Sequence, residues 1–165
     1  MNLRKYIWLP ILLLLTACEV SYGLIDGSID ADTFSVDIFE EQAPNAPAGY
    51  GANYTDFLKD FVLSRTKLKL TNNDADISIS GKIIFYDTSP ISVQADNQAS
   101  LNSLTVRIAV TVINNKNPEE SFEANFSQFS NYSSSQDLSV VESELLEDIN
   151  TKLSQDIVNR LTSNW

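Results

Sequence analysis

The sequence predicts an α+β domain built as a two-layer sandwich, with one mainly antiparallel β-sheet and two α-helices on one of its faces. Two patterns support this fold class. Stretches of alternating apolar and polar residues predict half-buried strands, and two longer stretches with apolar residues at helical spacing predict amphipathic helices. Each predicted element has one apolar side. Burying all these sides in one core leaves the other face of the sheet polar and open to solvent or a partner.

Residues 33–39 alternate and predict the first strand. A loop over residues 40–52 follows, because prolines and glycines interrupt any regular pattern there, and Tyr50 is expected to lie exposed in it. Asn53 is the predicted cap of the first helix. The core-facing side of that helix has apolar residues at helical spacing: Tyr54, Phe57, Leu58, Phe61 and Val62.

A short strand over 66–70 precedes a long strand over 76–86. Residues 101–113 form the clearest strand, and a turn of small polar residues over 114–118 leads to a returning strand over 121–129. This pair predicts an antiparallel hairpin with one apolar side. On the 76–86 strand, the apolar side is predicted to consist of Ile77, Ile79, Ile83 and Phe85, with Tyr86 on the opposite side.

The second helix is predicted after residue 135. Ser139 and Glu142 are expected to form its capping box. Its apolar stripe is long and regular: Val141, Leu145, Ile149, Leu153, Ile157 and Leu161. Acidic residues concentrate in its first half, where the helix dipole favours negative charge.

Residues 1–17 predict a lipoprotein signal peptide. Arg4 and Lys5 precede an apolar run over 7–15 that is too short to span a bilayer, which needs about 20 apolar residues. The run ends in Leu-Thr-Ala-Cys, the pattern at which bacterial lipoproteins are cleaved before a cysteine that takes the lipid. The chain therefore divides into the signal peptide, a lipidated tether over 18–32 and a domain over 33–165, anchored through Cys18 to a membrane outside the cytoplasm. An ordinary signal peptide with an incidental cysteine is the alternative.

The composition excludes several classes of function. After cleavage the chain has nine basic and 22 acidic residues, a net charge of −13, which argues against a nucleic-acid partner. Histidine is absent, and a lipidated Cys18 leaves no free thiol, so Ser-His-Asp catalysis, Cys-His catalysis and the usual zinc sites are excluded. The acidic pairs Asp37 with Glu40 and Glu119 with Glu120 have no spacing that selects them for hydrolysis. Neither an enzyme nor a cofactor or metal site is expected.

Several stretches together carry a resemblance to a known family. Taken together and in their order along the chain, these stretches resemble the Bacteroidota form of the LptE family of lipopolysaccharide-assembly lipoproteins. The resemblance covers nearly all of the cleaved chain. The matching stretches are Leu101-Asn102-Ser103-Leu104-Thr105, Asn114-Asn115-Lys116-Asn117-Pro118, Phe122-Glu123, Phe126-Ser127-Gln128-Phe129, Tyr132-Ser133-Ser134-Ser135-Gln136-Asp137-Leu138 and Asn164-Trp165.

The resemblance implies a location and a partner that periodicity and composition do not show. It implies a lipid in the outer membrane, with the domain on the periplasmic side, plugging and helping to assemble the LptD β-barrel that moves lipopolysaccharide to the cell surface. Lipopolysaccharide or lipooligosaccharide is a candidate ligand. The competing hypothesis is a glycan-binding or scaffold lipoprotein that acts without a barrel partner.

Two groups of residues are candidates for contact. The hairpin tip, Asn115, Lys116 and Asn117, is the candidate barrel contact, because a barrel lumen is wet and polar. The tip is expected to bury little and to be replaceable by glycines without unfolding the domain. Lys82 and Arg107 are the basic residues predicted on the open face of the two longest strands and are weak candidates for glycolipid contact. Ordinary cross-strand pairing, for example with Glu123, is the favoured interpretation for both.

Overall fold

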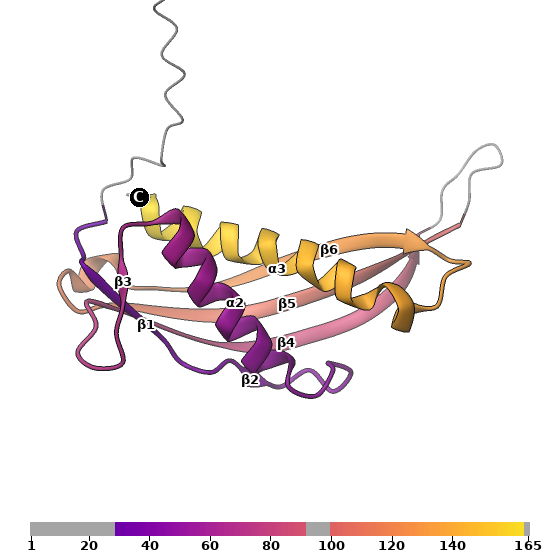
Figure 1. Cartoon of the computed structure of the whole chain (residues 1–165), viewed down its shortest axis with the longest axis horizontal. Coiled ribbons are helices and arrows are strands. Elements are labelled where there is room, and N and C mark those ends of the chain that lie inside the picture. Colours follow the sequence, from indigo (N-terminus) through magenta and orange to yellow (C-terminus); the bar gives the residue numbers. More distant parts are fainter. Residues whose placement is uncertain (1–28, 92–99, 164–165) are drawn as a thin grey trace, which may run out of the picture.

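The computed structural model describes residues 29–91 and 100–163, and over these residues it confirms the predicted α+β fold (Figure 1). A six-stranded sheet forms one layer, and two helices cover one of its faces. The elements in chain order are β1 (Thr33–Val36), β2 (Glu40–Glu41), α2 (Tyr50–Arg65), β3 (Lys69–Leu70), β4 (Ile77–Ile91), β5 (Leu101–Asn114), the 3-10 turn η2 (Pro118–Glu120), β6 (Phe122–Ser133) and α3 (Leu138–Thr162).

The sheet is antiparallel in its long ladders and parallel along one edge. The strand order is β3-β1-β4-β5-β6, and β2 also pairs with β4. β4, β5 and β6 pair antiparallel, whereas β1 and β2 run parallel to β4, and β3 runs parallel to β1. Parallel neighbours need a crossover connection, and α2 supplies it between β1 and β3.

Between β1 and β2 the chain leaves the ladder so that Phe39 can enter the core. Its side chain is 1% exposed. The ring lies against Gly81 of β4, where an added Cβ would stand 2.3 Å from the ring. Gly81 is thus required for a close approach, which explains a glycine in the middle of a strand.

The two helices and one face of the sheet share a single core. In α3 the predicted stripe is buried at its centre, at Leu145, Ile149, Leu153 and Ile157. In α2 the buried apolar residues include Tyr54, Leu58, Phe61 and Val62. The helical periodicity therefore identified the packed side of both helices correctly.

The start of α2 corrects the sequence analysis. The helix begins at Tyr50 rather than after Asn53, and Gly49 precedes it with φ 82°, a conformation that glycine adopts without steric cost. Tyr50 was expected to be exposed, but its side chain is buried, with 3% of its surface exposed. Its hydroxyl donates a hydrogen bond to Asn150 Oδ1 of α3 at 2.7 Å, which satisfies this polar group in the core. Burial raises the pKa of this hydroxyl well above its ordinary value. Because Asn150 lies 100 residues further along the chain, the residues around Tyr50 give no indication of this contact.

The cap of α3 also differs from the prediction. α3 begins at Leu138, and Asp137 is its cap, because the Asp137 carboxylate accepts a hydrogen bond from the Ser139 backbone N–H at 3.1 Å. Ser139 and Glu142 therefore form no capping box. Glu142 instead accepts a hydrogen bond from the hydroxyl of Tyr86 on β4.

A bulge in β4 reverses the predicted positions of two aromatic residues. The register against β5 shifts between Ile83 and Phe85. An extra residue in one strand exchanges the faces of everything that follows it. Tyr86 consequently points into the core and is 5% exposed, whereas Phe85 lies on the open face and is 37% exposed.

Candidate functional site

One end of the sheet brings together three parts of the chain that are far apart in sequence. The start of the described domain, the hairpin between β5 and β6, and the last turn of α3 meet there (Figure 1). We call this the tether end, because residues 19–28, which precede it in the chain, follow the predicted lipid site. Cys18 itself lies outside the described residues.

Asn114 organises the hairpin at the tether end. The residue is 3% exposed. Its Oδ1 accepts hydrogen bonds from the backbone N–H groups of Lys116 (3.0 Å) and Asn117 (2.9 Å), and its Nδ2 donates to Glu120 (2.9 Å). Asn117 Nδ2 also donates to Glu120, at 2.9 Å. The tip therefore has a defined shape that is held by its own side chains.

The tip is fastened to the rest of the domain more firmly than its composition indicates. Asn115 donates from its backbone to Asp76 O and from its side chain to Ala75 O, both at 2.8 Å. Lys116 Nζ lies 3.0 Å from the Asp32 carboxylate and 3.5 Å from that of Asp76. Replacing the tip with glycines would remove the side-chain contacts of Asn115 and Lys116 but would keep the backbone bond to Asp76 O. The isolated domain is still predicted to stay folded after this replacement, but with lower stability, because these contacts are lost.

Asp76 connects the tip to the first strand. Its carboxylate accepts hydrogen bonds from the backbone N–H groups of Asp32 (2.8 Å) and Thr33 (3.0 Å). These bonds favour the charged form and hold the pKa of Asp76 below its ordinary value, with a further contribution from Lys116. Nothing in the sequence marks Asp76 as a connecting residue, because an aspartate after a turn has no distinguishing local pattern.

Asp76→Asn is expected to lower the melting temperature at pH 7. A carboxyl group with a pKa lowered by folding stabilises the native state above its unfolded pKa, about 4, and this stabilisation is lost as the pH falls through the lower native value. Thermal unfolding at pH 7 and pH 3 should therefore show a difference from the unmutated protein that shrinks in acid. Asp74→Asn, in the adjacent turn, is the matched control. A difference of equal size at both pH values would contradict this role.

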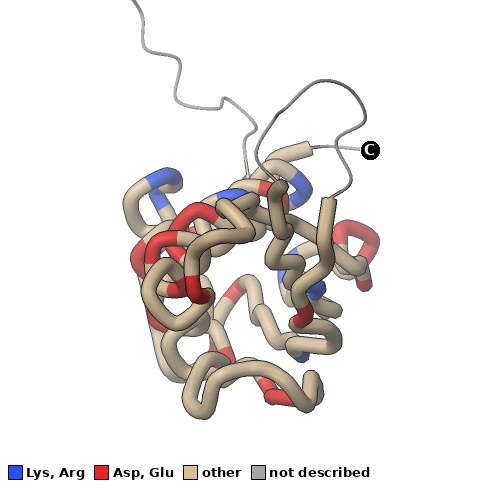
Figure 2. The backbone as a smooth tube through the Cα atoms, turned by 90° about the vertical axis from the view of Figure 1, so that its right-hand side faces the viewer, with Lys and Arg blue, Asp and Glu red and all other residues tan. Residues whose placement is uncertain are grey.

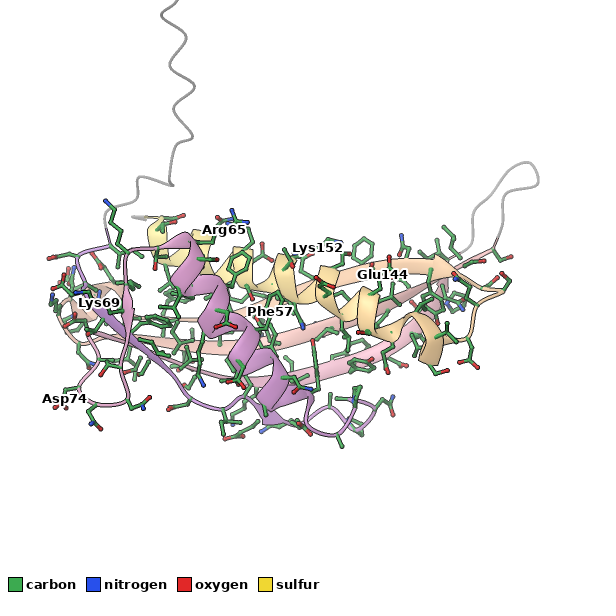
Figure 3. The ribbon with its side chains drawn as sticks, in the orientation of Figure 1. Phe57, Arg65, Lys69, Asp74, Glu144 and Lys152 are labelled. Carbon is green, nitrogen blue, oxygen red and sulfur yellow. The ribbon has the colours of Figure 1, made fainter. Side chains whose placement is uncertain are left out.

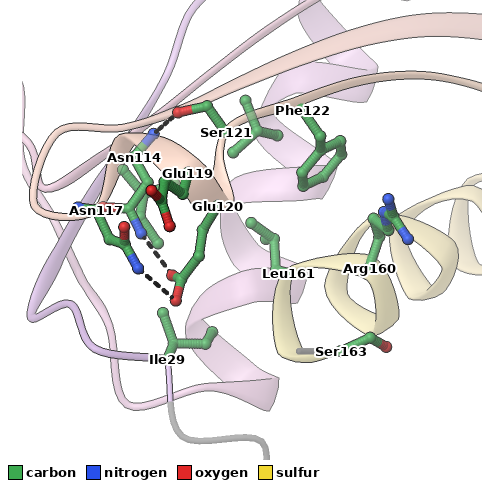
Figure 4. Close-up of a pocket in the computed structure, with 12 residues that line it drawn as sticks. Ile29, Asn114, Asn117, Glu119, Glu120, Ser121, Phe122, Arg160, Leu161 and Ser163 are labelled. Carbon is green, nitrogen blue, oxygen red and sulfur yellow. Dashed lines mark hydrogen bonds between the residues drawn. The ribbon is translucent and has the colours of Figure 1, made fainter. Parts of the chain in front are cut away.

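A pocket of about 440 Å³ opens at the tether end (Figure 4). Its apolar lining includes Ile29, Ile77, Val112 and Leu161, and its polar lining includes Glu119 and Glu120. The guanidinium group of Arg160 lies 5.5 Å from the centre of the Phe122 ring at the same site. Because Ile29 and Ser163 both line it, the pocket joins the two ends of the described domain.

The open face of the sheet carries both candidate basic residues. In the β4–β5 ladder Lys82 is opposite Ala109 and Arg107 is opposite Phe85, with the Ile83–Ile108 pair between them. Lys82 Nζ lies 3.5 Å from Glu40 Oε2, and the guanidinium group of Arg107 lies 5.2 Å from the centre of the Phe85 ring. Lys82 therefore forms a cross-strand pair, although with Glu40 rather than Glu123, which is opposite Thr111.

The same face is less polar than the sequence analysis expected. Phe85 and Phe129 are 37% and 53% exposed there, on either side of Arg107 and Thr105. The exposure of Phe85 could not be predicted from the alternating pattern, because the β4 bulge interrupts it. The exposure of Phe129 could be predicted from the sequence. In a strand successive side chains point to opposite faces, so Phe129 points to the face opposite that of Phe122 and Phe126.

The charged residues of the described part of the chain are dispersed over the fold. Acidic and basic positions are scattered over the elements (Figure 2). Glu40 is paired with Lys82 and Glu120 with two asparagine amides, so one member of each proposed acidic pair already serves the fold. Within residues 29–91 and 100–163, no three acidic side chains come together to hold a metal ion.

Comparison with known proteins gives the family. The fold is similar to that of a minor lipoprotein from Acinetobacter baumannii (13% identity, TM-score 0.51, covering 81% of this chain and 94% of that one). It is also similar to a hypothetical protein from Chlamydia trachomatis (11% identity, TM-score 0.52, covering 80% and 96%). A comparison with curated proteins finds no match. A family model for LptE, described as lipopolysaccharide-assembly, matches residues 31–161.

The chain belongs to the LptE family. Membership implies a role in lipopolysaccharide assembly, and the family consists of lipoproteins that are not enzymes. The solved structures, at these identities, support the fold alone. No helix among the described residues has the length and apolar character needed to cross a membrane.

Proposed function

We propose that this LptE-family protein is an outer-membrane lipoprotein, anchored through Cys18, that plugs and helps to assemble an LptD-like β-barrel for lipopolysaccharide transport. The observation that carries the proposal is the family match over residues 31–161, nearly the whole described domain. The predicted lipidation motif at Leu15-Thr16-Ala17-Cys18 supports the anchor.

The position of the tether supports one orientation in the barrel. Eleven residues lead from Cys18 to Ile29, and they span at most about 40 Å when fully extended. The 14-residue strand β5 alone is about 45 Å long. The lipid therefore keeps the tether end near the membrane surface. A plug that enters from the periplasm would rest its tether end at the mouth of the barrel and extend its opposite end into the lumen.

In this orientation Asn115, Lys116 and Asn117 contact the periplasmic rim of the barrel. The opposite end of the domain, at the turn between β6 and α3, lies deeper. Ser135, exposed in the β6–α3 turn, provides the required contrast with Asn115.

Site-specific crosslinkers at Asn115 and Ser135 test the proposal in intact outer membranes. We expect both positions to crosslink to the same barrel protein in a 1:1 complex. Peptides joined to Asn115 should come from periplasmic turns of the barrel, and those joined to Ser135 from lumen-facing strand residues. The Ser135 variant should retain the melting temperature of the unmutated protein, since this side chain is exposed, whereas the Asn115 variant loses the bond to Ala75 O and is expected to melt at a lower temperature.

The outcomes separate the parts of the proposal. Barrel crosslinks from Ser135 alone would remove the hairpin tip from the interface but keep the plug. Crosslinks from neither position would overturn the plug and favour a glycan-binding or scaffold lipoprotein without a barrel.

Lys82 and Arg107 remain the candidate contacts for an anionic glycolipid within this proposal. They take a secondary place, because Glu40 already neutralises Lys82 and the cleaved chain has a net charge of −13.

A further inference from the structure

The two edges of the sheet are built differently. On one edge, β3 and β2 have two residues each and β1 has four, and the strands are interrupted and carry Lys69, Glu40 and Glu41. Short strands and charges are the usual means of preventing another chain from pairing with an edge. The other edge is β6, which runs for 12 residues with one charged residue, Glu123, no proline and a continuous register. β6 therefore lacks most of this protection.

Two independent contacts show which backbone groups of β6 face outward. The Ser134 N–H donates to Ser100 O at 3.0 Å, so the hydrogen-bonded pairs with β5 fall on the even-numbered residues of β6. Phe129 O accepts from Lys152 Nζ of α3 at 3.1 Å, so the carbonyl of an odd-numbered residue points away from β5. The outward set is Glu123, Asn125, Ser127, Phe129 and Asn131. The inward set is Ala124, Phe126, Gln128, Ser130 and Tyr132.

One protective contact is present on this edge. Lys152 on α3 (Figure 3) caps the carbonyl group of Phe129 while also pairing with Asp148 at 2.6 Å. Its side chain is 43% exposed, so it can move away without opening the core. Among the described residues, Lys152 is the one side chain that bonds to a backbone group of the outward set.

We propose that the outward edge of β6 binds an extended segment of the barrel partner, which adds a strand to the sheet. This inference rests on the proposed function and specifies the surface through which it operates. The backbone groups of the outward set would supply the hydrogen bonds. Phe129, 53% exposed on the open face, would provide an aromatic neighbour for a β-branched or aromatic residue of the incoming strand.

Charge favours a partner segment over a second copy of this chain. The cleaved chain has a net charge of −13, and the first half of α3, a helix that packs beside β6, carries Glu144, Glu147 and Asp148. Two copies that joined their β6 edges would bring these acidic surfaces together. A segment that is neutral or basic meets no such repulsion.

Hydrogen exchange of individual amides in the purified complex tests the proposal on the unmutated protein. Amides of the inward set are already bonded to β5 and should exchange slowly with or without the partner. Amides of the outward set should exchange fast in the free protein and at least about ten-fold more slowly in the complex. A complex in which the outward set still exchanges fast would overturn the strand addition and leave the plug intact. Failure to obtain any barrel complex would overturn both.

Ser127→Pro tests the same edge by removing one outward N–H. Proline is tolerated on an edge strand where its missing N–H faces solvent, and Ser127→Ala keeps the N–H as the matched control. The proline variant should reduce recovery of the barrel about ten-fold at an unchanged fold, while the alanine variant should not. Equal recovery by both variants would overturn the proposal. Protection of the outward set in the isolated protein, together with dimers in sedimentation, would also overturn it and assign the edge to a second copy.

Discussion

Replacement of Ile149 by alanine is expected to lower the free energy of unfolding by about 2–5 kcal/mol. Ile149 is 0% exposed at the centre of the α3 stripe, between Leu145 and Leu153, where the helix packs against the sheet. Truncation removes buried apolar surface and leaves a cavity that the surrounding side chains fill only in part. Denaturant unfolding of the two proteins gives the difference directly.

Val140→Ala on the same helix is the matched control. Val140 is 79% exposed, so its truncation should change stability by no more than about 0.5 kcal/mol. Equal unfolding midpoints for Ile149→Ala and the unmutated protein would show that α3 does not seal the sheet in solution.

Replacement of Cys18 by alanine is expected to abolish membrane anchoring and to leave an uncleaved or mislocalised precursor. The thiol is the atom that would carry the lipid, and no other cysteine exists in the chain to replace it. Cell fractionation and the mass of the mature protein measure both effects. The domain itself should unfold at an unchanged temperature, because its described core begins at Ile29, eleven residues later.

Thr16→Ser, which keeps a small residue two positions before the cysteine, is the control for a general disturbance of export. A Cys18→Ala protein of normal mature size in the outer membrane would contradict the lipoprotein prediction. Anchoring and folding are thus tested separately, so a failure of one cannot be mistaken for a failure of the other.

Much of the fold could be predicted because amphipathic periodicity is a local property. The alternation in β5 and the stripe of α3 each report which side of the element is buried, whatever that side packs against. The candidate site was harder to predict. The composition of the hairpin tip indicated a turn, but not that Asn115 and Lys116 bond to residues about 40 and 80 positions earlier in the chain.

The sequence by itself determined the α+β class, the buried side of each helix, the acidic character and, through its ordered motifs, the LptE family. The tertiary structure decided the parallel pairing of β1, β2 and β3, the burial of Tyr50 and the exchange of Phe85 with Tyr86. It also decided which strand is left at the open edge. These features depend on contacts between distant segments and on one bulge, and neither leaves a regular pattern in neighbouring residues.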